Sequence, residues 1–358
     1  MRLAYFSGSS LFTYYFLLFT PPPMRLTHFL PFLAALSLQA QTPAPKQDAP
    51  KPPPPKAYAD PDKTDEDFPI QGEYAGEQDG KKFGAQIIAL GEGKFEAISY
   101  PGGLPGDGWD GDTSKVTRTA GQREAGQNTV TFEADTGDIQ GTVDGSSIAV
   151  YSKDGEKVFE LSRVQRASPT LEAAPPAGAV VLFSGKDKND FAGSRVTEDG
   201  LLMEGATSTE KFQDFTLHIE FRLPYTPTGR GQKRGNSGLY LQHRYEVQML
   251  DSFGLSGEDN ECGGLYKIAK PKVNMCFPPL TWQTYDIDFT AAKFDASGNK
   301  TANAKMTVKH NGVVIHQDQE LPKVTGGAKL PEDASPGPLH LQNHGDPVRY
   351  RNIWVVKK

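Results

Sequence analysis

Apolar and polar residues alternate with a period of two over most of the chain beyond residue 67. The clearest run covers residues 215–222, where every second residue is apolar (Phe215, Leu217, Ile219 and Phe221). This alternation is typical of a strand with one buried face. The pair Asn311-Gly312 between two further apolar runs predicts a tight hairpin. Helical periodicity is absent, so the pattern predicts an all-β protein.

Glycine and proline divide this pattern into parts. We predict a signal region at residues 1–40, a proline-rich linker at 41–66, and a small all-β domain of unrecognised role at 67–166. A second proline-containing linker covers 167–178. Many antiparallel strands over residues 179–358 then predict a two-sheet jelly roll.

The first forty residues contain two apolar stretches, one after each of Met1 and Met24. The segment from Met24 to Ala40 combines one positive charge, a short apolar run and small residues before Gln41. This is typical of a secretory signal and predicts export to the periplasm or the extracellular space. Two alternatives remain: a longer signal that begins at Met1, or a membrane anchor kept in the mature protein. No apolar run reaches the roughly 18 residues of a membrane-spanning helix, so we expect no span in the mature chain.

Charge and cysteine content narrow the range of partners and of covalent cross-links that we expect for this protein. With 38 Lys+Arg against 44 Asp+Glu, the formal net charge is −6, which argues against a nucleic-acid partner. The two cysteines, Cys262 and Cys276, lie close together in the sequence. In an exported chain they are candidates for a disulfide, the alternative being two buried free thiols.

The polar residues of the predicted strands are unusual in kind. Several carry amide, carboxylate or imidazole groups suited to binding hydroxyls, namely Glu220, Gln242, Glu246, Gln248, Gln342 and His344. With an aromatic platform such as Tyr240 or Trp282, they predict a carbohydrate-binding surface. The alternative is a solvated sheet face.

Motifs for other chemistries are missing from the sequence. It contains no serine nucleophile elbow, no His-Glu-x-x-His zinc motif and no phosphate-binding glycine loop, which leaves carboxylates and His344 as acid–base candidates. Residues 246–251 look similar to the catalytic strand of sandwich-fold endo-glucanases. Gln248 stands where that strand has a helper acid and Asp251 where it has the last glutamate, so an ordinary two-carboxylate mechanism is in doubt.

Six sequence blocks occur in one order: residues 181–186, 215–222, 235–242, 245–251, 282–286 and 342–354. Together they resemble the 3-keto-disaccharide hydrolase family, over about residues 176–358. This resemblance implies a concanavalin-like lectin/glucanase fold and an enzyme that acts on 3-keto-glycosides. Such an enzyme removes the C2 proton and breaks the glycosidic bond by β-elimination, or it hydrates the eliminated product, or it catalyses both reactions.

The resemblance also implies roles for particular residues. His344 or Glu246 is the expected base or metal ligand, with Asp251 as a further ligand or orienting group. Arg351 or Arg349 is the expected electrophile for the enolate. The expected substrate-binding residues are Asn236, Tyr240, Gln242, Gln248, Gln342 and Arg349. We expect at most one divalent metal ion (Glu246, Asp251 and His344) and no organic cofactor.

Two functions therefore follow from the sequence. The first is an exported enzyme that cleaves 3-keto-glycosides. The second is a non-catalytic, lectin-like carbohydrate-binding module on the same fold, with the N-terminal β domain as a second adhesive unit. For His344 the alternative role is a structural one, bracing the turn at residues 343–345.

Overall fold

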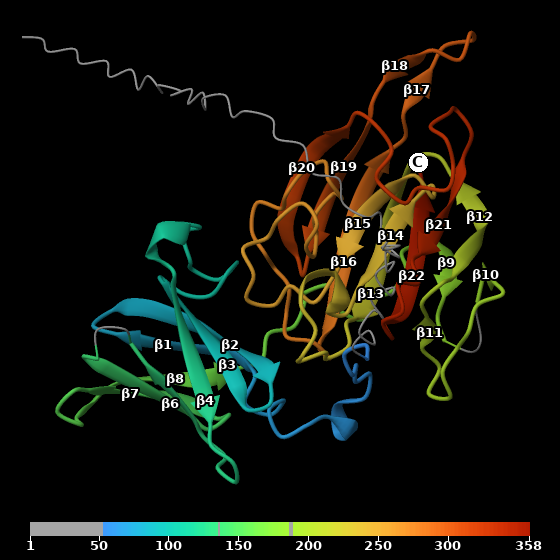
Figure 1. Ribbon diagram of the computed structural model, residues 1–358. Coiled ribbons are helices and arrows are strands. Elements are labelled where there is room, and N and C mark those ends of the chain that lie inside the picture. The colour runs from blue at the N-terminus through green and yellow to red at the C-terminus, as the bar shows by residue number, and fades with distance from the viewer. Residues whose placement is uncertain (1–52, 135–136, 186–188) are drawn as a thin grey trace, which may run out of the picture. The chain divides into compact units, whose positions relative to one another are not determined.

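A computed structural model describes residues 53–134, 137–185 and 189–358. The predicted signal region and residues 41–52 of the proline-rich linker lie outside these residues. The described part of the chain is all β apart from three short 3₁₀ helices, which confirms the predicted fold class (Pro61–Lys63, Thr113–Lys115 and Gly231–Lys233) (Figure 1). None of its helices is long and apolar enough to cross a membrane.

Eight antiparallel strands close into an up-and-down barrel in which each strand pairs with the next and β1 pairs with β8. The barrel strands are β1 (Gly72–Gln78), β2 (Lys81–Gly91), β3 (Lys94–Pro101), β4 (Thr117–Arg123), β5 (Val130–Glu133), β6 (Ile139–Val143), β7 (Ser147–Ser152) and β8 (Lys157–Val164). Closure removes the exposed edges that an open sheet of this size would have. Buried apolar side chains fill the inside, among them Tyr74, Ile87, Phe95 and Val130. We assign no function to the barrel.

The second half of the chain forms two antiparallel sheets. The five-stranded sheet has the order β10 (Phe191–Ala192), β12 (Thr207–Phe212), β21 (Gly337–Leu341), β14 (Ser237–Leu241) and β15 (Tyr245–Met249). The other sheet has seven strands, β11 (Leu202–Met203), β22 (Arg349–Lys357), β13 (Phe215–Arg222), β16 (Trp282–Thr290), β19 (Ala304–His310) and β20 (Val313–Leu321), with β9 (Val180–Phe183) also on β22. A separate pair contains β17 (Lys293–Phe294) and β18 (Lys300–Ala302).

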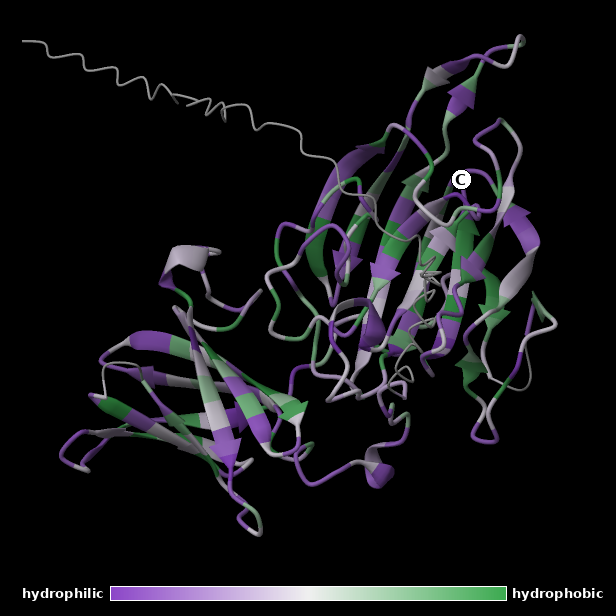
Figure 2. Ribbon diagram, viewed as in Figure 1, coloured by the Kyte–Doolittle hydropathy of each residue, from purple (hydrophilic) through white to green (hydrophobic). Residues whose placement is uncertain are grey.

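One hydrophobic cluster joins the two sheets into a sandwich. Leu239 and Val247 of the five-stranded sheet belong to the same buried cluster as Leu217 and Ile287 of the seven-stranded sheet. The alternating bands along the strands in Figure 2 reflect this one-sided burial. Residues between these core positions consequently face outward, on opposite sides of the sandwich.

Turns set the register of these strands. The predicted hairpin is present: Asn311 and Gly312 have φ values of 50° and 80° between β19 and β20, and such positive values favour Asn and Gly. In the β14–β15 connection, Gln242 and His243 have φ values of 54° and 55°. Gln242 therefore belongs to a turn and does not continue the alternating face of β14.

The predicted disulfide is not formed. Cys262 and Cys276 are buried free thiols. The Cys262 sulfur lies 3.3 Å from the Tyr285 hydroxyl, and the Cys276 sulfur lies 3.7 Å from the Leu250 carbonyl oxygen. Each thiol is thus accommodated by a polar neighbour within the core, in agreement with the alternative of two buried thiols.

Candidate active site

The outward face of the five-stranded sheet carries a row of polar side chains across four strands. Strand register places Thr207 opposite His340, His340 opposite Tyr240, and Tyr240 opposite Glu246. The Thr207 hydroxyl lies 2.8 Å from His340 Nδ1. Burial lowers the pKa of His340 to about 4, so its imidazole is neutral at pH 7. This row forms the floor of the candidate site.

Glu246 is the carboxylate of this row, and it is only 2% exposed. It has no salt bridge in the part of the chain that the structure describes. Burial raises the pKa of the Glu246 carboxyl to about 7, against the opposing effect of a hydrogen bond with Tyr240. A carboxyl group of this kind exchanges a proton readily near neutral pH.

Gly238 makes room for this carboxylate. A Cβ atom on Gly238 would lie 2.1 Å from Glu246 Oε1, far closer than atoms approach each other. Gly238 pairs with Gln248 in the strand register, so the Glu246 side chain reaches diagonally across to Gly238 on β14. A glycine inside a strand often marks such a close approach.

Loops close over the row. The Tyr240 hydroxyl donates to the Gly326 carbonyl oxygen at 3.0 Å, and the Thr325 hydroxyl accepts from the Glu246 amide at 2.9 Å. A Cβ on Gly326 would lie 3.4 Å from the Tyr266 ring. The structure therefore encloses Glu246, and a ligand reaches it only if these loops move. The predicted carbohydrate-binding surface is therefore covered at Glu246, Gln248 and Tyr240.

Five of the predicted residues come together. Gln342 Nε2 lies 3.4 Å from the Tyr240 hydroxyl, and its backbone amide donates to the Gly238 carbonyl oxygen at 2.8 Å. Asn236, just before β14, is linked to Gln248 through Gln232. The site thus contains Asn236, Tyr240, Glu246, Gln248 and Gln342.

Gln242, which belongs to the same sheet, does not join them. Its Nε2 donates to the Phe212 carbonyl oxygen at 2.9 Å, and its Oε1 accepts from Arg244 at 3.0 Å. Because the side chain is buried and bonded at both ends, its predicted role in sugar binding is not supported.

The predicted metal ligands are not assembled either. Asp251 Oδ2 accepts from Arg234 Nε at 2.7 Å, and Asp251 Oδ1 accepts from the Phe253 amide at 3.2 Å. His344 is exposed on the loop that follows β21. Across the described residues, no group of three or more His, Cys, Asp or Glu side chains could hold a metal ion. Glu246, Asp251 and His344 do not fit a shared ion.

Arg349 and Arg351 lie on β22, in the seven-stranded sheet, so they face away from Glu246. Arg349 pairs with Glu204 at 3.0 Å. Arg351 Nε lies 2.7 Å from Glu220 Oε2, and its guanidinium lies 4.3 Å from the centre of the Trp282 ring. Strand alternation had indicated which residues face outward but could not indicate from which sheet. The predicted grouping of Arg351 with Glu246 is therefore wrong.

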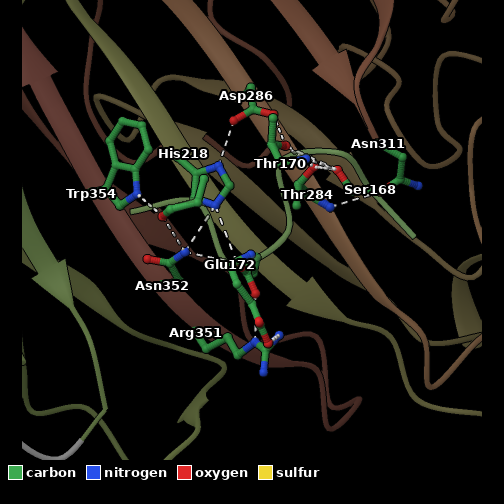
Figure 3. A network of polar contacts seen from close by, with 12 residues as sticks. Ser168, Thr170, Glu172, His218, Thr284, Asp286, Asn311, Arg351, Asn352 and Trp354 are labelled. Carbon is green, nitrogen blue, oxygen red and sulfur yellow. Dashed lines mark hydrogen bonds and ion pairs between the residues drawn. The ribbon is translucent and has the colours of Figure 1, made fainter. Parts of the chain in front are cut away.

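Arg351 belongs to a different polar network, which Figure 3 shows. His218 Nδ1 lies 2.6 Å from Asp286, its other nitrogen lies 3.6 Å from Glu220, and its ring stacks on Trp354. Residues 168–172 contact the network, since Thr170 donates to Asp286 at 2.6 Å and the Glu172 amide donates to Glu220. This arrangement fastens the segment before β9 to the sheet.

Five residues of the site had escaped prediction: Thr207, Gln232, Gly238, Tyr266 and His340. His340 precedes Gln342 by two positions, so the alternation itself could have placed it on the same face. Gly238 is a glycine within a strand, which is a further available signal. Gln232 lies in a short 3₁₀ helix and Tyr266 in a turn, and strand periodicity gives no indication for either.

A two-sheet sandwich with a buried acid–base candidate among amide groups on one sheet is an architecture suited to carbohydrate chemistry. A model of a protein family, the 3-keto-alpha-glucoside-1,2-lyase-like domain, matches residues 178–356. The chain belongs to this family, whose members are carbohydrate-active proteins. The resemblance noted in the sequence is thereby confirmed.

Solved structures similar to the chain include three proposed glycosyl hydrolases from Parabacteroides distasonis ATCC 8503. The first is 34% identical, over 51% of this chain and 85% of its own, with a TM-score of 0.47. The second is 19% identical, over 50% and 99%, with a TM-score of 0.36. The third is 14% identical, over 53% and 92%, with a TM-score of 0.34. No curated protein matches the chain.

Proposed function

We propose that the protein is an exported enzyme that cleaves 3-keto-glycosides, with Glu246 as the base that removes the C2 proton. The observation that carries this proposal is the buried Glu246 carboxyl, which has a pKa of about 7 and no cationic partner among the described residues. A base with a pKa near the working pH is the most effective at proton transfer.

The chemistry follows from the 3-keto group. The carbonyl at C3 acidifies the C2 proton, because the resulting carbanion is an enolate. Glu246 takes this proton, the C2 electron pair forms the C1–C2 double bond, and the C1–O bond breaks. The glycosidic oxygen leaves with the bonding pair and receives a proton, which protonated Glu246 can return. Addition of water across the double bond would complete a net hydrolysis.

We assign the role of base to Glu246 because the surroundings of the other candidates make them less suitable. Asp251 is committed to Arg234 at 2.7 Å. Glu220 lies in the other sheet and is bonded to Arg351 at 2.7 Å. Exposed His344 lacks the water-excluding surroundings that favour proton transfer at a carbon acid.

A turnover assay tests this proposal. The full mature chain is incubated with a 3-keto-α-glucoside and, in parallel, with the same glycoside carrying an ordinary 3-hydroxyl group. We expect release of the aglycone and of a keto sugar or its dehydrated form from the first substrate only. Cleavage of both at equal rates would contradict the proposal, because the mechanism requires the C3 carbonyl.

The lectin-like alternative makes a different prediction in the same assay. A binding module would retain both glycosides without releasing an aglycone. Binding without turnover by the wild-type protein would therefore favour that alternative.

Our proposal that the protein is exported rests on the signal-like sequence of Met24 to Ala40. N-terminal sequencing of the protein from fractionated cells tests it. A mature N-terminus near Gln41 in the periplasm or medium supports export, and an intact leader on cytosolic protein contradicts it.

A further inference from the structure

Two amide oxygens in the candidate site have no hydrogen-bond partner within the described part of the chain. They are Asn236 Oδ1 and Gln248 Oε1, and both belong to side chains that are 1% exposed. A buried polar atom without a partner costs about 1–3 kcal/mol, so natural proteins seldom retain one. Two such acceptors in one site indicate a missing donor.

Gln232 determines which way these amides face. Its Nε2 donates to the Asn260 carbonyl oxygen at 3.0 Å, which can only accept. Its Oε1 is then the acceptor for Asn236 Nδ2 at 3.0 Å and for Gln248 Nε2 at 3.2 Å. Both neighbouring amides must present nitrogen to Gln232, so both keep their oxygen for another partner.

A second bond fixes Asn236 independently. Its Nδ2 also donates to the Gln232 carbonyl oxygen at 3.0 Å, while its backbone amide donates to Asp346 at 2.7 Å. Rotating the Asn236 amide by half a turn would place its oxygen against that carbonyl. The free acceptor at Asn236 is consequently a property of the fold.

The two acceptors lie beside the proposed base. Gln248 is two residues from Glu246 on the same face of β15, and its cross-strand partner Gly238 lies beneath the Glu246 carboxylate. A sugar whose C2 proton approaches Glu246 would bring its hydroxyl groups toward this part of the sheet.

We propose that Gln232 is a positioning residue that holds Asn236 Oδ1 and Gln248 Oε1 as a pair of acceptors for two sugar hydroxyls. The ligand class is a glycoside with at least two free hydroxyl donors, bound after the covering loops open. This proposal rests on the proposed function, because it assigns the ligand's hydroxyl groups to the same site. It makes Gln232 a determinant of affinity rather than of the proton-transfer step.

The experiment compares Gln232→Leu with Gln232→Glu. The glutamate keeps an acceptor oxygen for Asn236 and Gln248, although it loses the donor to the Asn260 carbonyl oxygen. Leucine removes the acceptor and frees the Gln248 amide, while the backbone carbonyl of residue 232 still holds Asn236. We expect Gln232→Leu to raise KM for the 3-keto-glycoside by about tenfold or more, which is the value of one to two hydrogen bonds. We expect kcat to stay near the wild-type value, and Gln232→Glu to restore most of the affinity.

Controls separate this inference from the proposed function. Gln317→Leu, an exposed glutamine on β20 in the other sheet, should leave KM unchanged. Calorimetric titration of Glu246→Gln protein, with and without Gln232→Leu, measures binding of the glycoside and of its deoxy analogues without any turnover. Loss of affinity on Gln232→Leu in that titration supports the inference even if the wild type shows no turnover.

Unchanged affinity in Gln232→Leu would overturn the inference, whether or not the enzyme turns over. A crystal structure with bound glycoside is a second, independent test of the inference. Sugar hydroxyls within hydrogen-bond distance of Asn236 Oδ1 and Gln248 Oε1 support it, while ordered water alone on both oxygens contradicts it.

Discussion

The two faces of the sandwich each bury a glutamate, and the two glutamates behave in opposite ways. Glu220 on β13 is 0% exposed and Glu246 on β15 is 2% exposed. Burial pushes the pKa of Glu220 upward, but hydrogen bonds from His218, Asn352, the Glu172 amide and Arg351 outweigh it and lower the pKa to about 2. For Glu246 burial dominates, and the pKa rises to about 7.

The difference lies in the partners rather than in burial. Glu220 remains ionised because donors surround it, so it serves as an anchor for the segment before β9. Glu246 has no cationic partner among the described residues, so it can gain and lose a proton at neutral pH. Of two equally buried carboxyls, only the one with fewer partners is suited to acid–base chemistry.

The largest expected effect is on turnover. Glu246→Gln removes the base while it preserves the shape of the side chain, so kcat for a 3-keto-glycoside should fall by about 10²- to 10⁴-fold. Glu220→Gln, the matched change on the opposite face, should leave kcat within a few-fold of wild type. Steady-state kinetics on both variants measure this contrast, and a similar loss in both would remove the distinction between the two sites.

For the free energy of unfolding we expect a clear loss in Glu220→Gln, the variant whose turnover should stay close to wild type. Glu220→Gln removes the buried carboxylate that pairs with Arg351 and His218, leaving His218 with Asp286 and Arg351 with Glu172, which should cost about 3 kcal/mol of unfolding free energy. Urea denaturation at pH 7 measures this loss. An unchanged midpoint for Glu220→Gln would show that the network is not an anchor.

The pH dependence of stability should separate the two glutamates as well. Glu246 has a raised pKa in the folded protein, so its contribution is fully present below its unfolded pKa near 4.5 and is lost as pH rises toward 7. Over this range the wild type should lose about 3 kcal/mol relative to Glu246→Gln. Denaturation curves for both proteins between pH 4 and 8 test this, and parallel curves would contradict the raised pKa.

The smallest expected effect on turnover is that of a substitution at Gly238. Gly238→Ala places a methyl group where the Glu246 carboxylate lies and should displace it. We expect kcat to fall by about tenfold, because misplacing a reacting group has a cost of this order. Gly141→Ala, at a barrel strand position with only one contact at 3.9 Å, is the control and should retain full activity.

Much of this arrangement could be predicted from the sequence, and particular residues show where prediction ends. Period-two alternation correctly placed Tyr240, Glu246 and Gln248 on one face. The same rule failed at Gln242, because a positive φ takes that residue out of the strand. It also could not separate Arg351 from Glu246, since both face outward and the assignment to a sheet depends on long-range pairing.

The hydrogen-bond partners of the site residues were harder still to predict from the sequence. The free oxygens of Asn236 and Gln248 depend on Gln232, which lies in a short 3₁₀ helix at residues 231–233. Tyr240 and the Glu246 backbone likewise depend on Gly326 and Thr325, which lie far along the chain. Such contacts arise from tertiary packing, so no local pattern reports them.

Exchange of the C2 hydrogen in deuterated water tests the central claim most directly. The 3-keto-glycoside is incubated with enzyme across pH 5–9, and deuterium at C2 of recovered substrate and product is followed by NMR. If Glu246 is the base, wild-type enzyme should catalyse this exchange with a rate that rises through a midpoint near 7, as Glu246 ionises, and Glu246→Gln should abolish it. Equal exchange by wild type and Glu246→Gln would contradict it.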